Sequence, residues 1–424
     1  MKRLLILLAV LTTSCGSNTP KHVREYVASS WDRTVRENTE DDGTLIGLPF
    51  PYTVPSPEGM FQEMYYWDTY FTNEGLLQDG LVDLAKGNTS NLLYMVERFG
   101  FVPNGSRTWY LSRSQPPFLS MMVASVFKRT QDTEWLAGAC QTLLKEYDFW
   151  MTRRITPCGL NRYSGEGAEQ WLLDEFVITG GKRLNTEFTP GSQEEHDAIG
   201  RNFVAEAESG WDFNPRFDRR CEDFCPVDLN ALMYAFEVNM ADFSRALGKD
   251  PEPWEEAAAH RKELMTALLW DGNCFYDYDW VNGRLSPVVS AAIFTPLYTG
   301  MASEEQAKGV AAALKKLEFK HGLAVCEDKP YPYKYQWSYP NTWPPSTFMA
   351  VFGLDRYGYT AQARKLAKKY IDLVCRSFKM TGKIWEKYDA VQGFSSPGEE
   401  YQTPEMMGWS AATYSCLYDY IHSL

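Results

Sequence analysis

The 424-residue chain has no long run of lysine and arginine, and its formal net charge is −13. Nucleic acid is therefore not an expected partner, because proteins bind it through clustered positive charge. Beyond the N-terminus the chain has no apolar stretch long enough for a transmembrane helix. It also has no repeat at a fixed period, which argues against a solenoid. With 44% hydrophobic and 23% charged residues, the composition is typical of a soluble globular protein with a large core.

Patterns of metal ligands are also missing. Cys221 and Cys225 are four residues apart, but no second cysteine pair and no histidine cluster accompanies them. Structural zinc sites take four such ligands, so the sequence predicts neither a metal nor a cofactor. A local disulfide between these two cysteines stays open. Cys140, Cys375 and Cys416 lie in apolar helical patterns and are interpreted as small buried side chains.

The N-terminus carries the one short apolar run that looks like a targeting segment. Residues 1–3 are basic, residues 4–11 are apolar, and Thr-Thr-Ser-Cys-Gly follows at 12–16. This pattern predicts an export signal that is too short to span a membrane as a helix. It resembles a bacterial lipoprotein signal, in which Cys15 would become the lipidated first residue of the mature protein. Cleavage nearby without lipidation is the alternative.

These features predict three parts of the chain: a signal peptide at 1–15, a polar tether at 16–22, and one domain at 23–424. No composition shift or low-complexity linker divides that domain. We therefore expect an exported protein, either periplasmic or anchored at the outer membrane. Its membrane contact would be the N-terminal lipid alone.

Most segments of the domain with a clear hydrophobic period are helical. Helices are predicted at 23–36, 76–99, 118–129, 132–152, 227–247, 251–269, 303–317, 345–357, 361–378 and 404–421. Residues 274–280 alternate and predict a strand or hairpin that turns at Asn282-Gly283. The domain is thus expected to be all-helical with a few short hairpins. An (α/α)6 toroid, two concentric rings of six helices, is one architecture that holds so many, although periodicity alone does not single it out.

Aromatic residues are abundant, at 15% of the chain, with 14 Trp and 25 Tyr. They suit either a large core or a carbohydrate groove. One acidic, aromatic stretch at 205–213 combines Gly210, Trp211 and Asp212. Glycine allows a close backbone approach, the indole offers an apolar face to a sugar, and partial desolvation would keep a proton on the aspartate. This arrangement suits the general acid of glycosidic bond cleavage. A loop aspartate beside a buried tryptophan is the alternative.

Four further stretches mix aromatic side chains with carboxylates, amides or arginine: 61–71, 104–118, 335–345 and 384–389, the last followed by 398–401. Polar groups of this kind orient sugar hydroxyls, while aromatic rings supply apolar contact. Each stretch lies at a loop or a helix start. Together with residues 205–213 they predict a carbohydrate-binding site.

In this order the five stretches resemble segments of the trehalase family, glycoside hydrolase family 37, from residue 58 to about residue 415. Residues 61–71 and 335–345 are similar to its two signatures. The resemblance implies an (α/α)6 barrel and an inverting mechanism without a metal. It makes Asp212 the general acid and Glu386 the general base. A surface ion pair with Lys387 is the alternative reading for Glu386.

The resemblance also implies sugar-contacting residues at Trp67, Asp68, Asn104, Arg113, Ser114, Gln115, Gly210 and Glu400. The aromatic and amide content of the same stretches adds Phe61, Trp211, Gln336, Trp337 and Trp343 as expected substrate-binding residues. Plain core packing is the alternative for the tryptophans at 67 and 337. A structural ion pair is the alternative for the arginine at 113. The expected partner is a small carbohydrate, a disaccharide or a short α-glycoside.

Departures from the family pattern concern arginine. Met60 stands where the family has an arginine. Residues 188–195 lack the arginine of a second family segment. Of the family's three sugar-clamping arginines, Arg113 is therefore the one that clearly remains. Each lost charge-assisted contact costs ~1.5–3 kcal/mol. The sequence therefore predicts an inverting hydrolase of α-glucosidic disaccharides, with the hypothesis that trehalose is cleaved more slowly than another α-glycoside. A non-catalytic or weakly active sugar-binding lipoprotein on the same fold is the alternative.

Overall fold

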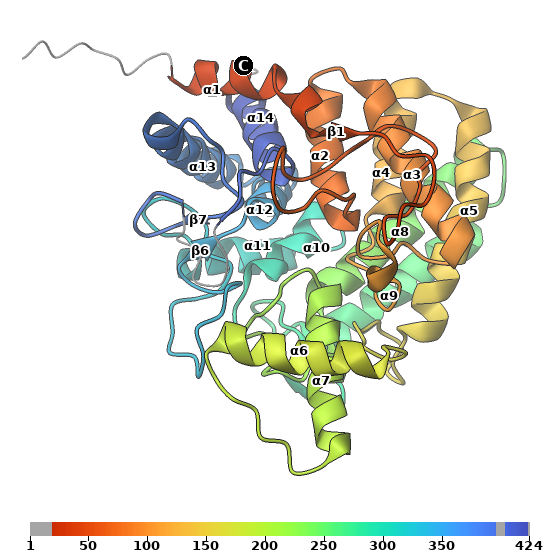
Figure 1. Cartoon of the computed structure of the whole chain (residues 1–424), viewed down its shortest axis with the longest axis vertical. Helices are drawn as coiled ribbons and strands as arrows, with labels where there is room; N and C mark the ends of the chain where they lie inside the picture. Colours follow the sequence, from red (N-terminus) through yellow and green to blue (C-terminus); the bar gives the residue numbers. More distant parts are fainter. Residues whose placement is uncertain (1–18, 396–402, 423–424) are drawn as a thin grey trace, which may run out of the picture.

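A closed ring of helices forms the centre of the computed structural model, which describes residues 19–395 and 403–422 (Figure 1). Each inner helix contacts the next, and the last packs back against the first. In ring order the inner helices are α2 (Tyr66–Gln78), α4 (Leu119–Thr130), α8 (Val227–Ala246), α10 (Thr295–Tyr298), α12 (Pro344–Arg356) and α14 (Trp409–His422).

A second set of helices surrounds this ring: α1 (Thr19–Ala28), α3 (Val82–Phe99), α5 (Thr133–Arg153), α9 (Glu252–Leu269), α11 (Glu304–Ala313) and α13 (Thr360–Thr381). Helix α3 packs on α2 and α4, α5 on α4 and α8, α9 on α8, and α13 on α12 and α14, while α1 packs on α13 and α14. Hydrogen bonds from Gln306 to Thr266 and from Gln362 to the Ala311 carbonyl connect α11 to α9 and α13. The (α/α)6 toroid is therefore confirmed.

Burial differs between the outer helix α13 and the inner helix α2. The outer helix α13 buries one face, with Leu366, Tyr370 and Val374 at helical spacing. The inner helix α2 is buried almost all round, so it has no apolar stripe. The sequence consequently missed most of α2 and predicted one helix at 76–99. In the structure Gly80 (φ +79°) separates α2 from α3.

Six of the predicted helices agree with α4, α5, α8, α9, α12 and α13 to within three residues at each end. The prediction at 303–317 is divided into α11 and a short 3-10 turn, Leu314–Lys316. Helix α14 begins five residues later than predicted, at Trp409. Helix α1 ends at Ala28 rather than at residue 36, and it begins at Thr19, inside the predicted tether.

An additional helical hairpin, α6 (Gln170–Leu184) and α7 (Gln193–Glu208), packs on itself outside the two rings (Figure 1). Ser192 begins α7 by accepting a hydrogen bond from the Glu195 amide, which satisfies one of the free N–H groups of the first turn. The sequence predicted neither helix. The hairpin matters for the site because α7 leads directly into residues 209–213.

Short strands join loops that are distant in sequence. They are β1 (Val35–Arg36) with β2 (Tyr52–Thr53), the sheet β3 (Phe224–Cys225), β4 (Tyr278–Asp279) and β5 (Arg284–Leu285), and β6 (Asn341–Thr342) with β7 (Tyr388–Asp389), all antiparallel. The predicted hairpin is confirmed by β4 and β5, with Gly283 at φ +64° in the turn. Among the described residues no helix is long and apolar enough to cross a membrane.

Candidate active site

Residues from all five sequence stretches line one cavity of about 270 Å³, at the end of the toroid where α2, α12 and α14 begin. The expected site residues that line it are Phe61, Trp67, Asp68, Asn104, Arg113, Gln115, Gly210, Asp212, Gln336, Trp337, Trp343 and Glu386. The lining is completed by Met60, Tyr65, Tyr110, Glu175, Phe176, Thr179, Arg183, Ala207, Met406 and Trp409.

Backbone pairing brings these stretches together. Residues 61–71 and 104–118 are joined by the bridge between Tyr65 and Gly105, and the Gln115 side chain accepts a hydrogen bond from the Trp67 amide at 3.1 Å. The pairing of β6 with β7 joins residues 335–345 to residues 384–389. Five segments that are scattered over the chain thus surround one space.

Tryptophan rings form one wall of the cavity. Trp337 and Trp343 stack with centroids 3.9 Å apart and planes 6° apart, and Trp67 lies 5.6 Å from Trp337. Gly210 lies against Trp67: its φ is +75°, and a Cβ there would be 2.8 Å from the indole Cε2 atom. Only glycine fits this contact without displacing the wall. The close approach that glycine allows at this position is to the Trp67 ring.

Asp212 lies in the loop after α7, with about one third (34%) of its side chain exposed. Its Oδ2 accepts a hydrogen bond from Arg183 Nη1 at 3.1 Å. Arg183 comes from α6, where Phe176, Thr179 and Arg183 follow each other at intervals of three and four residues, so they share one helix face. Arg183 was not among the predicted site residues, because the sequence pattern did not predict α6. That helical spacing was the available signal.

Glu386 is almost fully buried, at 2% exposure, just before β7. Its Oε2 accepts a hydrogen bond from Lys387 Nζ at 2.8 Å, and the Lys387 ammonium lies 5.0 Å from the centre of the Trp343 ring. The indole N–H of Trp409 donates to the Glu386 carbonyl at 3.1 Å. The ion pair of the alternative reading exists, but it is buried at the cavity wall and not on the surface.

A third carboxyl group, that of Asp68, lies in the same cavity. Burial raises its pKa well above the usual range, and repulsion from Glu386 and Asp212 adds to this effect. Burial thus favours the protonated form of Asp68, which has an O–H to donate. Behind the cavity, burial also raises the pKa of Glu206 to about 8, with a contribution from Asp212.

Arg113 is a buried cation at the cavity wall, with 7% of its surface exposed. Its guanidinium lies 5.1 Å from the Tyr110 ring and 5.0 Å from the Phe176 ring. Its Nε and Nη1 atoms are buried without a hydrogen-bond partner in the described part of the chain. Buried donors of a native protein are almost always paired, so these two N–H groups are suited to a ligand. The structural ion pair that was the alternative for Arg113 is not observed among the described residues.

The comparisons with known proteins agree with this geometry. A family model described as Trehalase matches residues 13–421. The chain belongs to the trehalase family. The periplasmic trehalase of Xanthomonas campestris pv. campestris (strain B100) is 34% identical over 431 residues, covering 92% of this chain and 71% of the relative. This membership makes the chain an O-glycoside hydrolase.

Solved structures show the same fold. Neutral trehalase Nth1 from Saccharomyces cerevisiae superposes with a TM-score of 0.76 at 29% identity, covering 94% of this chain and 80% of the yeast chain. A GH63 mannosylglycerate hydrolase from Thermus thermophilus, in complex with glucose, has a TM-score of 0.65 at 18% identity. The superposition covers 93% of this chain and 99% of the hydrolase chain. The second similarity concerns the fold alone.

Two expected site residues of this trehalase-family chain do not line the cavity. Ser114 points its hydroxyl at the Val102 carbonyl, 2.7 Å away. Trp211 is 1% exposed, its ring stacks on Trp337 at 5.1 Å, and the Arg216 guanidinium lies 4.5 Å from the ring centre. Trp211 thus supports the tryptophan wall from behind. Cys15 and Glu400 lie outside the described residues.

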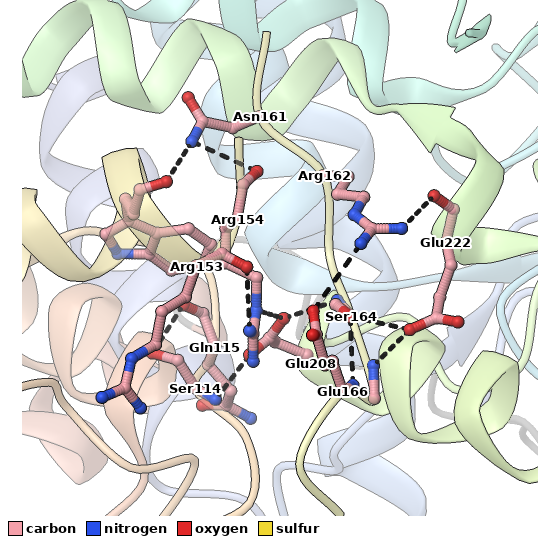
Figure 2. A network of polar contacts seen from close by, with 12 residues as sticks. Ser114, Gln115, Arg153, Arg154, Asn161, Arg162, Ser164, Glu166, Glu208 and Glu222 are labelled. Atoms are coloured by element: carbon pink, nitrogen blue, oxygen red, sulfur yellow. Dashed lines mark hydrogen bonds and ion pairs between the residues drawn. The ribbon is translucent and has the colours of Figure 1, made fainter. Parts of the chain in front are cut away.

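The loops of the trehalase-family site are held from behind by Glu208, the last residue of α7 (Figure 2). Its carboxylate accepts two hydrogen bonds from Arg154, at 2.7 and 2.9 Å, and one each from the amides of Ser114 and Ser164, at 2.8 and 2.9 Å. Glu208 and Arg154 are both buried. The network fixes the loop of Arg113 against the loop of Asp212. Neither Glu208 nor Arg154 was predicted to be functional.

Among the described residues no group of three or more His, Cys, Asp or Glu side chains has an arrangement that would hold a metal ion.

Proposed function

We propose that this chain hydrolyses an α-glucosidic disaccharide, with α,α-trehalose as substrate, and that the anomeric configuration is inverted. The family membership and the similarity to periplasmic trehalases support the substrate. The observation that carries the mechanism is that Asp212 and Glu386 line one cavity with the tryptophan wall and the unpaired donors of Arg113. The presence of both carboxyl groups argues against the alternative of a non-catalytic sugar-binding protein.

In this proposal Asp212 is the general acid. It donates a proton to the glycosidic oxygen as the bond to the anomeric carbon breaks, which converts the leaving sugar into a neutral alcohol. Asp212 is the more exposed of the two carboxyl groups, so the leaving oxygen can reach it.

Glu386 is the general base of the proposal. It accepts a proton from a water molecule that attacks the anomeric carbon on the face opposite the leaving oxygen. The buried Lys387 compensates its charge, and Trp409 holds its backbone. Attack from the opposite face inverts the configuration. Asp68 and the cationic Arg113 supply hydrogen bonds to the sugar hydroxyls.

Arg183 bears on the choice of substrate. The hypothesis that trehalose is a poor substrate assumed that Arg113 is the one guanidinium left at the site. Arg183, from a helix that the sequence did not predict, lines the same cavity beside Asp212. Because the leaving sugar lies next to the general acid, we assign Arg183 to that second ring. Trehalose is therefore expected to be the better substrate than other α-linked disaccharides.

A substitution of Arg183 distinguishes contacts with the second sugar ring from contacts with the first. Arg183→Gln is expected to lower kcat/KM for trehalose by about 10- to 100-fold, the worth of one charge-assisted hydrogen bond. The same variant should cleave an aryl α-glucoside, which lacks the second sugar, within about threefold of the wild-type rate. The measurement is kcat/KM on both substrates and on a panel of α-linked disaccharides.

Arg245→Gln is the matched control, because Arg245 lies on α8 with half of its side chain exposed (49%) and outside the cavity. It should leave both rates unchanged. Equal losses on both substrates in Arg183→Gln would refute the assignment to the second ring. Another α-glycoside cleaved a hundredfold faster than trehalose would restore the hypothesis of a changed specificity. Absence of turnover on every α-glycoside would favour the sugar-binding alternative.

We further propose that the protein is exported and anchored through a lipid on Cys15. The periplasmic relatives support the compartment, and the lipoprotein-like signal supports the anchor. Cys15→Ser should move the protein from the membrane fraction to the soluble fraction of a bacterial host. Wild-type protein that is wholly soluble, with a mature N-terminus other than Cys15, would contradict the anchor while leaving export intact.

A further inference from the structure

Two cysteines that are distant in sequence lie side by side, at the two ends of the segment that contains α6, α7 and Asp212. Cys158 is on the turn between Ile155 and Asn161, which pair as an isolated bridge, and Cys225 is on β3. Their Sγ atoms are 3.6 Å apart. No other pair of cysteines in the described part of the chain is in sulfur–sulfur contact. The Cys221–Cys225 pairing that the sequence left open is not observed, since Cys225 contacts Cys158 instead.

The two thiols differ in access and acidity. Cys225 is fully buried, whereas Cys158 is partly exposed on its turn. The Thr156 hydroxyl lies 3.1 Å from Cys158 Sγ and 3.5 Å from Cys225 Sγ. The hydrogen bond with Cys225, helped by Thr156, lowers the pKa of the Cys158 thiol to about 6. The same hydrogen bond and burial raise the pKa of Cys225.

We propose that Cys158 and Cys225 form a disulfide when the protein meets an external disulfide. Closing the bond requires the sulfurs to approach from 3.6 Å to about 2.05 Å, which side-chain rotation on the exposed turn can supply. The accessible partner is the more acidic thiol, and a thiolate is the attacking species in thiol–disulfide exchange.

The exchange balances in two steps. The Cys158 thiolate attacks one sulfur of the external disulfide, forms a mixed disulfide and releases one thiolate. Cys225 then loses its proton and attacks Cys158 Sγ, which releases the second thiolate. Two protein thiols are thereby oxidised to one disulfide, and the external disulfide is reduced to two thiols. Export, proposed above, would bring the chain to a compartment where such oxidants are present.

The bond would close a covalent loop over residues 158–225. This loop contains α6, α7 and the residues Arg183, Glu208 and Asp212. It would tie both ends of the hairpin that covers the cavity to the body of the toroid. A cross-link of this span stabilises the folded protein mainly by restricting the unfolded chain. For a chain of this length the expected gain in Tm is about 3–6 °C.

Peptide mapping tests the pairing directly. The full-length protein is treated with oxidised glutathione, alkylated and digested with trypsin without reduction. We expect the peptides 155–162 and 221–245 to be joined, at a mass two hydrogen atoms below their sum. Because Cys221 lies in the second peptide, the digest is repeated with Cys221→Ser, which should keep the link. Alkylated Cys158 and Cys225 in the oxidised sample, or a link that is lost in Cys221→Ser, would overturn the proposal.

Thermal unfolding provides the second readout. Oxidised wild-type protein should melt about 3–6 °C above the dithiothreitol-reduced protein. Cys158→Ser should abolish this difference, whereas Cys416→Ser, at a partly exposed cysteine on α14, should retain it. Equal Tm values for oxidised and reduced wild type would contradict the predicted stabilisation. Neither readout uses activity, so the result is independent of the proposed catalytic roles.

Discussion

Asp212→Asn and Glu386→Gln are each expected to lower kcat on trehalose by about 10²–10⁴-fold, because each removes one proton transfer from the transition state. Both variants should fold, since amides replace carboxyl groups of nearly the same size. A substrate whose leaving group needs no proton distinguishes the general acid from the general base, because only the base is still required. On α-glucosyl fluoride, Asp212→Asn should retain most of the wild-type rate, whereas Glu386→Gln should remain slow.

The control for these variants is Asp174→Asn, at an aspartate of α6 with half of its side chain exposed (51%) and outside the cavity lining. It should retain wild-type kcat. Far-ultraviolet circular dichroism and Tm should be measured for all three variants. Wild-type turnover in either site variant would remove that residue from the mechanism. Equal loss on both substrates in Asp212→Asn would contradict its role as the acid.

Glu208→Ala is expected to lower the free energy of unfolding by about 3–5 kcal/mol, because it leaves the buried Arg154 guanidinium without a counter-charge. It also leaves the amides of Ser114 and Ser164 without their acceptor. Since this network holds the loops of Arg113 and Asp212, kcat/KM should fall as well. Urea denaturation followed by tryptophan fluorescence measures the change in stability.

The exposed ion pair between Lys368 and Asp372 on α13 is the control for the buried pair of Arg154 and Glu208. Asp372→Ala should cost no more than about 1 kcal/mol, because solvent screens that pair. Glu208→Gln, which keeps the size and one acceptor, should cost less than Glu208→Ala. A loss below about 1 kcal/mol in Glu208→Ala would mean that the buried network does not stabilise the site.

How far the sequence predicted the site depended on where the site residues lie. Asp212, Glu386 and Arg113 stand in short aromatic and polar stretches, so their residue types alone drew attention to them, and the structure brings them to one cavity. Arg183 stands in α6, which has no such stretch around it, and Glu208 lies inside the stretch 205–213 but was not predicted to be functional. Their importance comes from tertiary contacts with Asp212 and Arg154, which a single sequence does not contain.

The fold shows the same limit. Outer helices such as α13 were predicted because one apolar face alternates with a solvated one. Helix α2 was mostly missed because burial on every side removes that alternation. Trp211 was expected to contact the sugar because it is next to Asp212 in the sequence. Successive residues of a loop, however, point in different directions. Its indole instead packs behind the wall, on Trp337.

The anomer of the first-released sugar tests the inverting mechanism most directly. Proton NMR should follow trehalose hydrolysis before mutarotation, at high enzyme concentration. If water attacks opposite the leaving group, one ring is released as β-glucose and the leaving ring as α-glucose, in equal initial amounts. An aryl α-glucoside should give β-glucose alone at first. Initial release of α-glucose alone from both substrates would show retention of configuration and contradict the assignment of Asp212 and Glu386 as an acid–base pair.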